Sequence, residues 1–141
     1  MKELDDIVDI FDLLGDWDQR YQYLIELGEQ MEPIADKDRI EDNRVKGCMS
    51  QVWVAAHCEP DNEHLVYFTG DCDTAIIKGV LALLIKLSSG KTADEIQTLE
   101  LDEVFDKLQL GEHLSPNRHV GVYAIVELMK AKARSAAKQA A

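Results

Sequence analysis

The sequence predicts an α+β fold, in which a small antiparallel sheet of about three strands packs against several helices. Two observations lead to this prediction. Segments whose apolar residues recur at helical spacing lie on both sides of two extended runs, and a turn separates the two runs. A chain of 141 residues with 46% hydrophobic residues is long enough to bury one core. We therefore expect residues 1–141 to form a single domain.

Two amphipathic helices are expected to open the chain. Apolar residues fall at helical spacing over residues 4–11 and again over residues 17–28, with a break at Gly15. The break carries the pattern of a helix start, because Asp16 can accept hydrogen bonds from free amides of the first turn and Gln19 follows three positions later. The second helix is therefore expected to begin directly after Asp16.

A β-hairpin is expected in the middle of the chain. Residues 51–58 are rich in valine, residues 59–62 have turn composition, and residues 64–69 form a second extended run. Residues 44–47 could add a short third strand. The charged segment 32–43 before them contains a proline and is interpreted as a solvated connector.

The second half of the chain predicts further helices. Residues 76–87 form an apolar stripe that spreads onto other faces, as expected of the most buried helix. Thr92 and Glu95 have the spacing of a capping box, and residues 102–108 predict another short helix. Residues 115–116 are Ser-Pro, a common start of a helix, and the last helix is expected to follow them.

Charge and hydropathy exclude several classes of function. The chain has 27 acidic and 15 basic residues and a formal net charge of -12, so it should repel a polyphosphate backbone, and nucleic acid is not expected as a partner. The N-terminal residues are acidic, unlike a secretory signal. The longest apolar run, residues 75–87, contains two lysines and is shorter than the ~20 residues that span a bilayer. We expect a cytoplasmic protein without a membrane segment.

One cysteine has an unusual setting. Gly47 can adopt backbone angles closed to other residues, so the chain can turn sharply and present Cys48 at a tip instead of packing it. Arg44 and Lys46 are the nearest charges in sequence, and positive neighbours favour the nucleophilic thiolate. By residue chemistry alone, an inert core cysteine is still the commoner case. The total of three cysteines is odd, which favours free thiols in a reducing compartment.

Three blocks of sequence carry more information than the cysteine alone, and they extend from the middle of the chain to its last helix. In order, they are Arg44-Val45-x-Gly47-Cys48-x-Ser50-Gln51-Val52-Trp53, then Gly70-Asp71-x-Asp73-x-Ala75-Ile76-Ile77-x-Gly79, then Leu114-Ser115-Pro116-x-Arg118-x-x-Gly121.

This pattern resembles the SufE/CsdE family of sulfur acceptors for cysteine desulfurases, over nearly the whole chain. The resemblance implies a SufE/IscU-like fold and a carrier whose Cys48 takes persulfide sulfur from a SufS/CsdA-like desulfurase, stimulates that enzyme, and passes the sulfur to an iron-sulfur scaffold or another acceptor. Such a protein acts with the desulfurase and is not a stand-alone enzyme. It needs no cofactor, because the resemblance puts pyridoxal phosphate on the desulfurase. Monomer and homodimer both stay open.

Further residues are candidates to support Cys48, beside Gly47 with its conformational freedom. Ser50 and Gln51 are natural hydrogen-bond donors to a sulfur anion, although either could instead satisfy backbone groups of the loop. Arg118 belongs to the third block and is a candidate for the cysteine loop or for a partner surface. An ordinary surface arginine is the alternative interpretation.

Cys72 leads to a second hypothesis, because a serine usually stands between the two aspartates in the family pattern. Iron-sulfur scaffolds of the IscU type, which the SufE family resembles in fold, also place a cysteine before a corresponding helix. Cys48, Cys72 and either Cys58 or His57 could then form an iron-sulfur or zinc site. The chain has no Cys-x-x-Cys spacing, so the sulfur-acceptor hypothesis is preferred.

Overall fold

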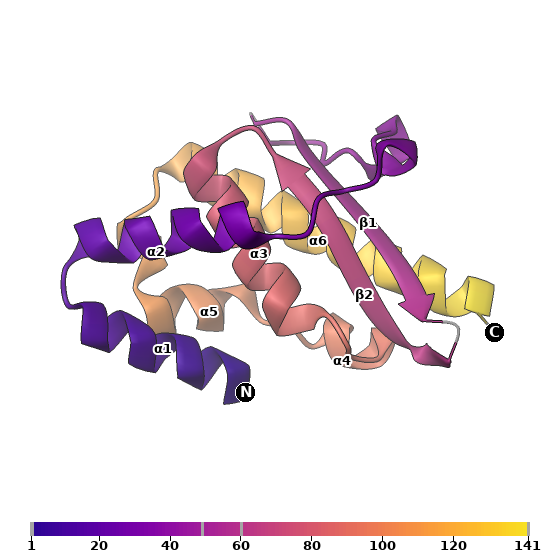
Figure 1. Ribbon diagram of the computed structural model, residues 1–141, viewed down its shortest axis with the longest axis horizontal. Coiled ribbons are helices and arrows are strands. Elements are labelled where there is room, and N and C mark those ends of the chain that lie inside the picture. The colour runs from indigo at the N-terminus through magenta and orange to yellow at the C-terminus, as the bar shows by residue number, and fades with distance from the viewer. Residues whose placement is uncertain (1, 49, 60, 141) are drawn as a thin grey trace.

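Six α-helices and one pair of strands make up the fold in the computed structural model, which describes residues 2–48, 50–59 and 61–140 (Figure 1). In chain order the elements are α1 (Lys2–Leu14), α2 (Trp17–Gln30), the 3-10 turns η1 (Asp36–Asp38) and η2 (Glu41–Asn43), β1 (Val52–Glu59), β2 (Asn62–Cys72), α3 (Ala75–Ser88), α4 (Ala93–Gln97), α5 (Leu101–Leu108), the 3-10 turn η3 (Leu110–Glu112) and α6 (Pro116–Ala140). The predicted α+β class is confirmed.

Three helices begin at the positions that their capping residues and Pro116 predicted. Asp16 Oδ1 accepts a hydrogen bond from the Gln19 amide at 2.9 Å, directly before α2. Thr92 and Glu95 form the reciprocal capping box at the start of α4. Pro116 is the first residue of α6, where its missing amide hydrogen costs nothing.

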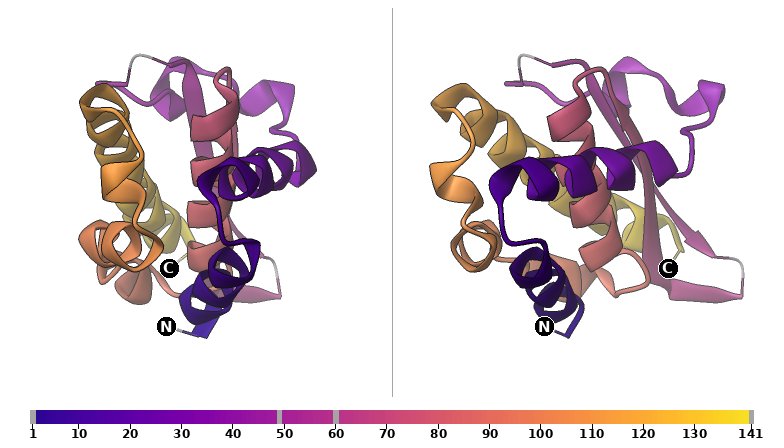
Figure 2. Two further views of the ribbon diagram at one scale, coloured as in Figure 1. Left: turned by 90° about the vertical axis from the view of Figure 1, so that its left-hand side faces the viewer. Right: turned by 60° about the vertical axis from the view of Figure 1, so that its left-hand side comes forward.

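The predicted most buried helix, α3, lies at the centre of the molecule. Figure 2 shows it between α6 on one side and α1 and α2 on the other. It approaches α2 closely because Gly79 has no side chain: a Cβ there would lie 2.2 Å from the carbonyl oxygen of Leu24. Among the helices of the described ranges, none combines the length and apolarity that crossing a membrane requires.

The two strands pair antiparallel, with Val52 opposite Cys72 and Val54 opposite Gly70. Val52 and Val54 are fully buried, whereas His57 on the other face of β1 is exposed. Of the two strands, α3 packs mainly along β2 and α6 mainly along β1. Gly70 faces α3 and Cys58 faces α6 from the same side of the hairpin, so the two helices cover one of its faces.

The predicted third strand does not form, so the sheet has two strands within the described residues instead of about three. Residues 44–45 make only an isolated bridge, in which Arg44 pairs with Trp53 and the Val45 amide donates to the Val52 carbonyl at 2.8 Å. The segment between two turns is too short to pair as a strand. The turn η2 ends at Asn43, and the next turn already includes Lys46 and Gly47, the latter with φ +86°, which leaves Arg44 and Val45 for pairing.

Candidate functional site

Cys48 lies on the loop between this bridge and β1, and it shares a cavity with residues from the starts of α3 and α6. The starts of these two helices lie at the same end of the molecule (Figures 1 and 2). The side chain is half-buried, so the expectation of a thiol presented at a tip is wrong. It packs against α6 at Gly121, where a Cβ would lie only 2.7 Å from the Cys48 Sγ. The absence of a side chain at Gly121 makes room for the thiol.

A cavity of about 230 Å³ opens beside the thiol. Three segments that are far apart in sequence build it: the cysteine loop, the start of α3 and the start of α6. One lining side chain is aliphatic, and most of the others carry a polar group. The lining residues are Cys48, Ser50, Thr74, Ile77, Ser115, Asn117 and Arg118.

Ser50 lines this cavity, but its hydroxyl is already engaged. The Ser50 and Thr74 hydroxyl oxygens lie 2.6 Å apart, and the Thr74 hydroxyl donates to Asp73 Oδ1 at 3.2 Å. The single Thr74 proton is then used on Asp73, so Ser50 donates to Thr74 and not to the sulfur. Gln51 is exposed outside the lining, and its backbone amide donates to Asp73 Oδ1 at 3.0 Å. Both residues hold the loop against the start of α3.

The charges that face the thiol differ from those expected from sequence proximity. Arg44 and Lys46 both bind Glu41, and these hydrogen bonds, with that of Lys46 the stronger cause, lower the pKa of the Glu41 carboxyl. Arg118 instead lines the cavity, with its backbone amide 3.4 Å from the Ser115 hydroxyl at the start of α6. Its guanidinium makes no hydrogen bond or ion pair within residues 2–48, 50–59 and 61–140. Arg118 is therefore available to an anion in the cavity.

Asp71 anchors the end of β2 next to the site. It binds Arg39 and lies 3.3 Å from the Lys78 ammonium, while the Arg39 guanidinium lies 5.1 Å from the centre of the Trp53 ring. Burial works against ionisation of Asp71, but hydrogen bonds from Arg39, the Cys72 amide and Lys78 outweigh it and lower the pKa of the carboxyl. This network fixes the chain directly before α3.

The residues of the alternative metal or cluster site do not converge. Cys58 lies far along β1 from the cysteine loop, opposite Val66, and its thiol faces the Ala136 carbonyl at 3.8 Å. His57 next to it is on the opposite, exposed face of the strand. Among the described residues, no three histidine, cysteine or carboxylate side chains are placed to hold a metal ion. The scaffold hypothesis thus loses its ligand set.

Several residues around Cys48 were not among the predicted site residues. Gly121 carried the clearest signal, because glycine inside a helix costs about 1 kcal/mol relative to alanine and indicates a close approach. Its partner could not be read from the sequence, since Cys48 lies in a distant segment. Thr74, Ser115 and Asn117 are ordinary residues of helix starts, and only the fold brings them to the thiol.

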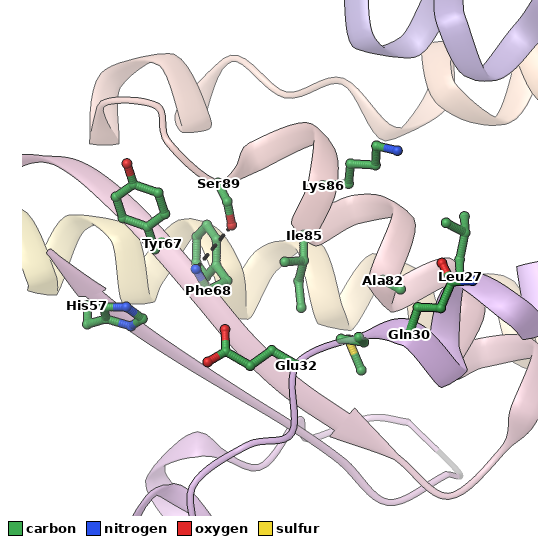
Figure 3. Close-up of a pocket in the computed structure, with 11 residues that line it drawn as sticks. Leu27, Gln30, Glu32, His57, Tyr67, Phe68, Ala82, Ile85, Lys86 and Ser89 are labelled. Atoms are coloured by element: carbon green, nitrogen blue, oxygen red, sulfur yellow. Dashed lines mark hydrogen bonds between the residues drawn. The ribbon is translucent and has the colours of Figure 1, made fainter. Parts of the chain in front are cut away.

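A second, larger hollow of about 410 Å³ lies elsewhere on the molecule (Figure 3). It runs between the end of α2, the strands and α3, and includes the facing rings of His57 and Tyr67, whose centres are 6.1 Å apart. Ser89 accepts a hydrogen bond from the Phe68 amide at 3.2 Å within it. None of its lining residues is a cysteine, so this groove lacks the nucleophile that marks the first cavity.

Comparison with known proteins agrees with the sequence pattern. The SufE family model, described as an Fe-S metabolism associated domain, matches residues 5–133. An uncharacterized SufE-like protein of Rhizobium etli is 41% identical over 140 residues, which cover 97% of this chain and 95% of that protein. Another from Rhizobium meliloti is 38% identical over 134 residues, covering 94% and 96%.

A solved structure has the same fold. The solution structure of a hypothetical protein from Thermus thermophilus superposes with a TM-score of 0.75 and covers 95% of both chains. The sequence identity is 20%, so this likeness concerns the fold alone.

Proposed function

The chain belongs to the SufE family, whose domain is associated with Fe-S metabolism, and we propose that it accepts sulfur as a persulfide on Cys48 from a cysteine desulfurase. The observation that carries this proposal is the position of the Cys48 thiol at a small polar cavity that is also lined by the cation of Arg118. The sulfur would then pass to an iron-sulfur scaffold or to another acceptor.

The proposed chemistry is a relative of thiol-disulfide exchange. The Cys48 thiolate attacks the terminal sulfur of the persulfide on the desulfurase cysteine. A new bond forms between the Cys48 Sγ and this terminal sulfur, while the bond between the terminal sulfur and the desulfurase cysteine breaks. The electron pair leaves with the desulfurase thiolate. The step needs no metal or cofactor on this chain, and the pyridoxal phosphate that releases sulfur from cysteine belongs to the proposed partner.

The cavity fits the product of this step. Its volume of about 230 Å³ is several times the ~30 Å³ that one water molecule occupies in the liquid, so one additional sulfur atom on Cys48 has room. A persulfide anion there would face the Arg118 guanidinium and the first turn of α6, whose free amides and dipole favour negative charge. The cavity walls would also limit attack by external thiols.

Acceptance requires a movement of the loop. Because the thiol packs against Gly121, it has to leave this contact to reach a sulfur atom held inside another protein. Gly47 lies next to it with φ +86°, a conformation that a glycine enters and leaves at little cost. We propose that docking of the desulfurase draws the Cys48 loop outward and that the loop returns to α6 with its sulfur.

Desulfurase turnover tests the proposal. A SufS/CsdA-like desulfurase is supplied with cysteine, and alanine formation is measured with the wild-type chain, with Cys48→Ser and with Cys58→Ser as the matched cysteine control. We expect stimulation by the wild type and by Cys58→Ser, and none by Cys48→Ser. Equal stimulation by Cys48→Ser would refute Cys48 as the acceptor.

A further inference from the structure

A second thiol lies directly behind the Cys48 cavity and has no part in the function proposed above. Cys72 is the last residue of β2 and the strand partner of Val52, and only 6% of its surface is exposed. The thiol is therefore closed to a docked protein. Any chemistry at Cys72 has to involve a group of the same chain.

The structure brings the segments that carry Cys48 and Cys72 together. Beyond the Val52–Cys72 pair, the Asp73 amide donates to the Gln51 carbonyl at 3.1 Å. One residue further, the hydroxyl oxygens of Ser50 and Thr74 lie 2.6 Å apart. The two segments thus run side by side from the strand pair up to the cysteine loop.

Thr74 connects the two thiols. Its side chain lines the cavity that holds Cys48, and its backbone amide donates to the Cys72 Sγ at 3.4 Å. The Cys72 sulfur therefore lies on the inner side of the same wall. A disulfide needs Cα atoms about 4.4–6.8 Å apart, so the step requires the Cys48 loop to bring its thiol to Cys72, a movement for which Gly47 with φ +86° gives backbone freedom.

The electrostatic surroundings keep Cys72 protonated. Burial raises the pKa of this thiol to about 11, and the charges of Asp73, Cys48 and Asp71 add to the effect. At neutral pH Cys72 is a thiol, which does not compete for incoming sulfur and which carries a proton.

We propose that Cys72 resolves the persulfide on Cys48 and releases its sulfur as sulfide. This inference rests on the proposed function, because it requires a persulfide at Cys48. The persulfide anion on Cys48 first takes the proton of the Cys72 thiol, and the Cys72 thiolate so formed attacks the Cys48 Sγ, so that a disulfide forms between the two residues. The bond from the Cys48 Sγ to the terminal sulfur breaks, and the terminal sulfur leaves with the electron pair.

The step is balanced within the chain. The departing sulfur takes up the proton of the Cys72 thiol, so a persulfide anion and a thiol become a disulfide and hydrosulfide. No oxidant is needed, because the persulfide sulfur is reduced to sulfide while the two cysteines are oxidised. An external thiol reductant would restore both cysteines. Sulfur that is not passed on would thus be released, and the carrier would close itself to further loading.

Chemical loading tests this inference without a desulfurase. The full chain is treated with inorganic polysulfide and desalted, and then intact mass, sulfide release and non-reducing peptide maps are followed over time. In the wild type we expect the added sulfur on Cys48 to disappear with the release of one equivalent of sulfide, while a Cys48–Cys72 disulfide forms. The rate should not depend on protein concentration, because the reaction is intramolecular.

Two variants complete the experiment. Cys72→Ser keeps a hydrogen-bond acceptor for the Thr74 amide, and its persulfide should persist at least about tenfold longer. Cys58→Ser should behave as the wild type. The inference is overturned if the wild-type persulfide is as long-lived as that of Cys72→Ser, or if the peptide map of the wild type links Cys48 to Cys58. Either result leaves the desulfurase experiment, and with it the proposed function, unaffected.

Discussion

The two hollows beside the strand pair differ in size and in chemistry, and the smaller one holds the site. The groove of Figure 3, at about 410 Å³, exceeds the Cys48 cavity at about 230 Å³, yet it contains no cysteine. Its polar groups join secondary-structure elements, as the Phe68 amide and the Ser89 hydroxyl do. In the cavity, polar groups surround a nucleophile.

This difference shows that the position of a reactive atom identifies a site better than volume does. The cavity has a thiol at its wall, a cation at its rim and a second thiol behind it. The groove has two facing rings, which are typical of packing between elements. The predictions below test whether chemistry is confined to the cavity.

The largest expected effect concerns the thiol behind the cavity wall. In a variant that keeps Cys72 and replaces Cys48 and Cys58 by serine, ultraviolet thiolate absorbance should rise only toward pH 11, because burial is the main cause of the raised pKa. At pH 9 about 1% of Cys72 should then be thiolate, against more than half for an ordinary cysteine. A midpoint near 8.5 would show that Cys72 is not enclosed.

Gly121→Ala should disturb the cavity itself. The new Cβ would lie 2.7 Å from the Cys48 Sγ, so the thiol has to leave its contact with α6, although alanine favours the helix. We expect a persulfide on Cys48 to lose its cover and to be reduced by added thiol about tenfold faster. The measurement is the half-life of the persulfide by intact mass.

Gly111→Ala is the matched control for this substitution. A Cβ at Gly111 would make only ordinary contact with the His119 ring at 3.9 Å, so the persulfide should keep its wild-type half-life. Equal half-lives for Gly121→Ala and the wild type would contradict the role of the Gly121 contact.

Arg118→Ala should have a smaller effect. Loss of the cation from the cavity rim should reduce the rate of sulfur transfer to Cys48 about two- to fivefold, as is typical for one exposed charge. Arg118→Lys should retain most of the rate, because the charge stays. The rate is measured as single-turnover sulfur transfer at low salt. An unchanged rate in Arg118→Ala would show that Arg118 is an ordinary surface residue without a role in the transfer.

The groove should give the smallest effect. His57→Ala removes one of the two facing rings, and the free energy of unfolding should change by less than about 1 kcal/mol. Sulfur transfer to Cys48 should be unchanged. A loss of transfer as large as that of Arg118→Ala would mean that the groove takes part in the reaction and would break the distinction between the two hollows.

The fold was predictable where local chemistry decides it. Asp16 and Thr92 cap the helices expected from their side chains, and the extended runs 51–58 and 64–69 form the predicted hairpin as β1 and β2. The prediction of a third strand was wrong because turns flank this segment on both sides, η2 before it and the turn at Gly47 after it. Too few residues are left between them to pair as a strand.

The site was less predictable because its contacts come from distant segments. Cys48 was expected to be presented, but the missing side chain of Gly121 lets it pack on α6. Arg44 and Lys46 were expected to act on the thiol, but the nearby carboxylate of Glu41 binds both. Sequence proximity is a poor guide to which charges meet when a local partner of opposite sign is available.

The most direct test of the central claim is to locate the sulfur. The chain is mixed briefly with a cysteine desulfurase and cysteine, and peptide mapping then identifies the residue that carries one added sulfur atom. We predict added sulfur on Cys48 in the wild type and none in Cys48→Ser. Added sulfur that persists in Cys48→Ser and vanishes in Cys72→Ser would contradict the account and make Cys72 the acceptor.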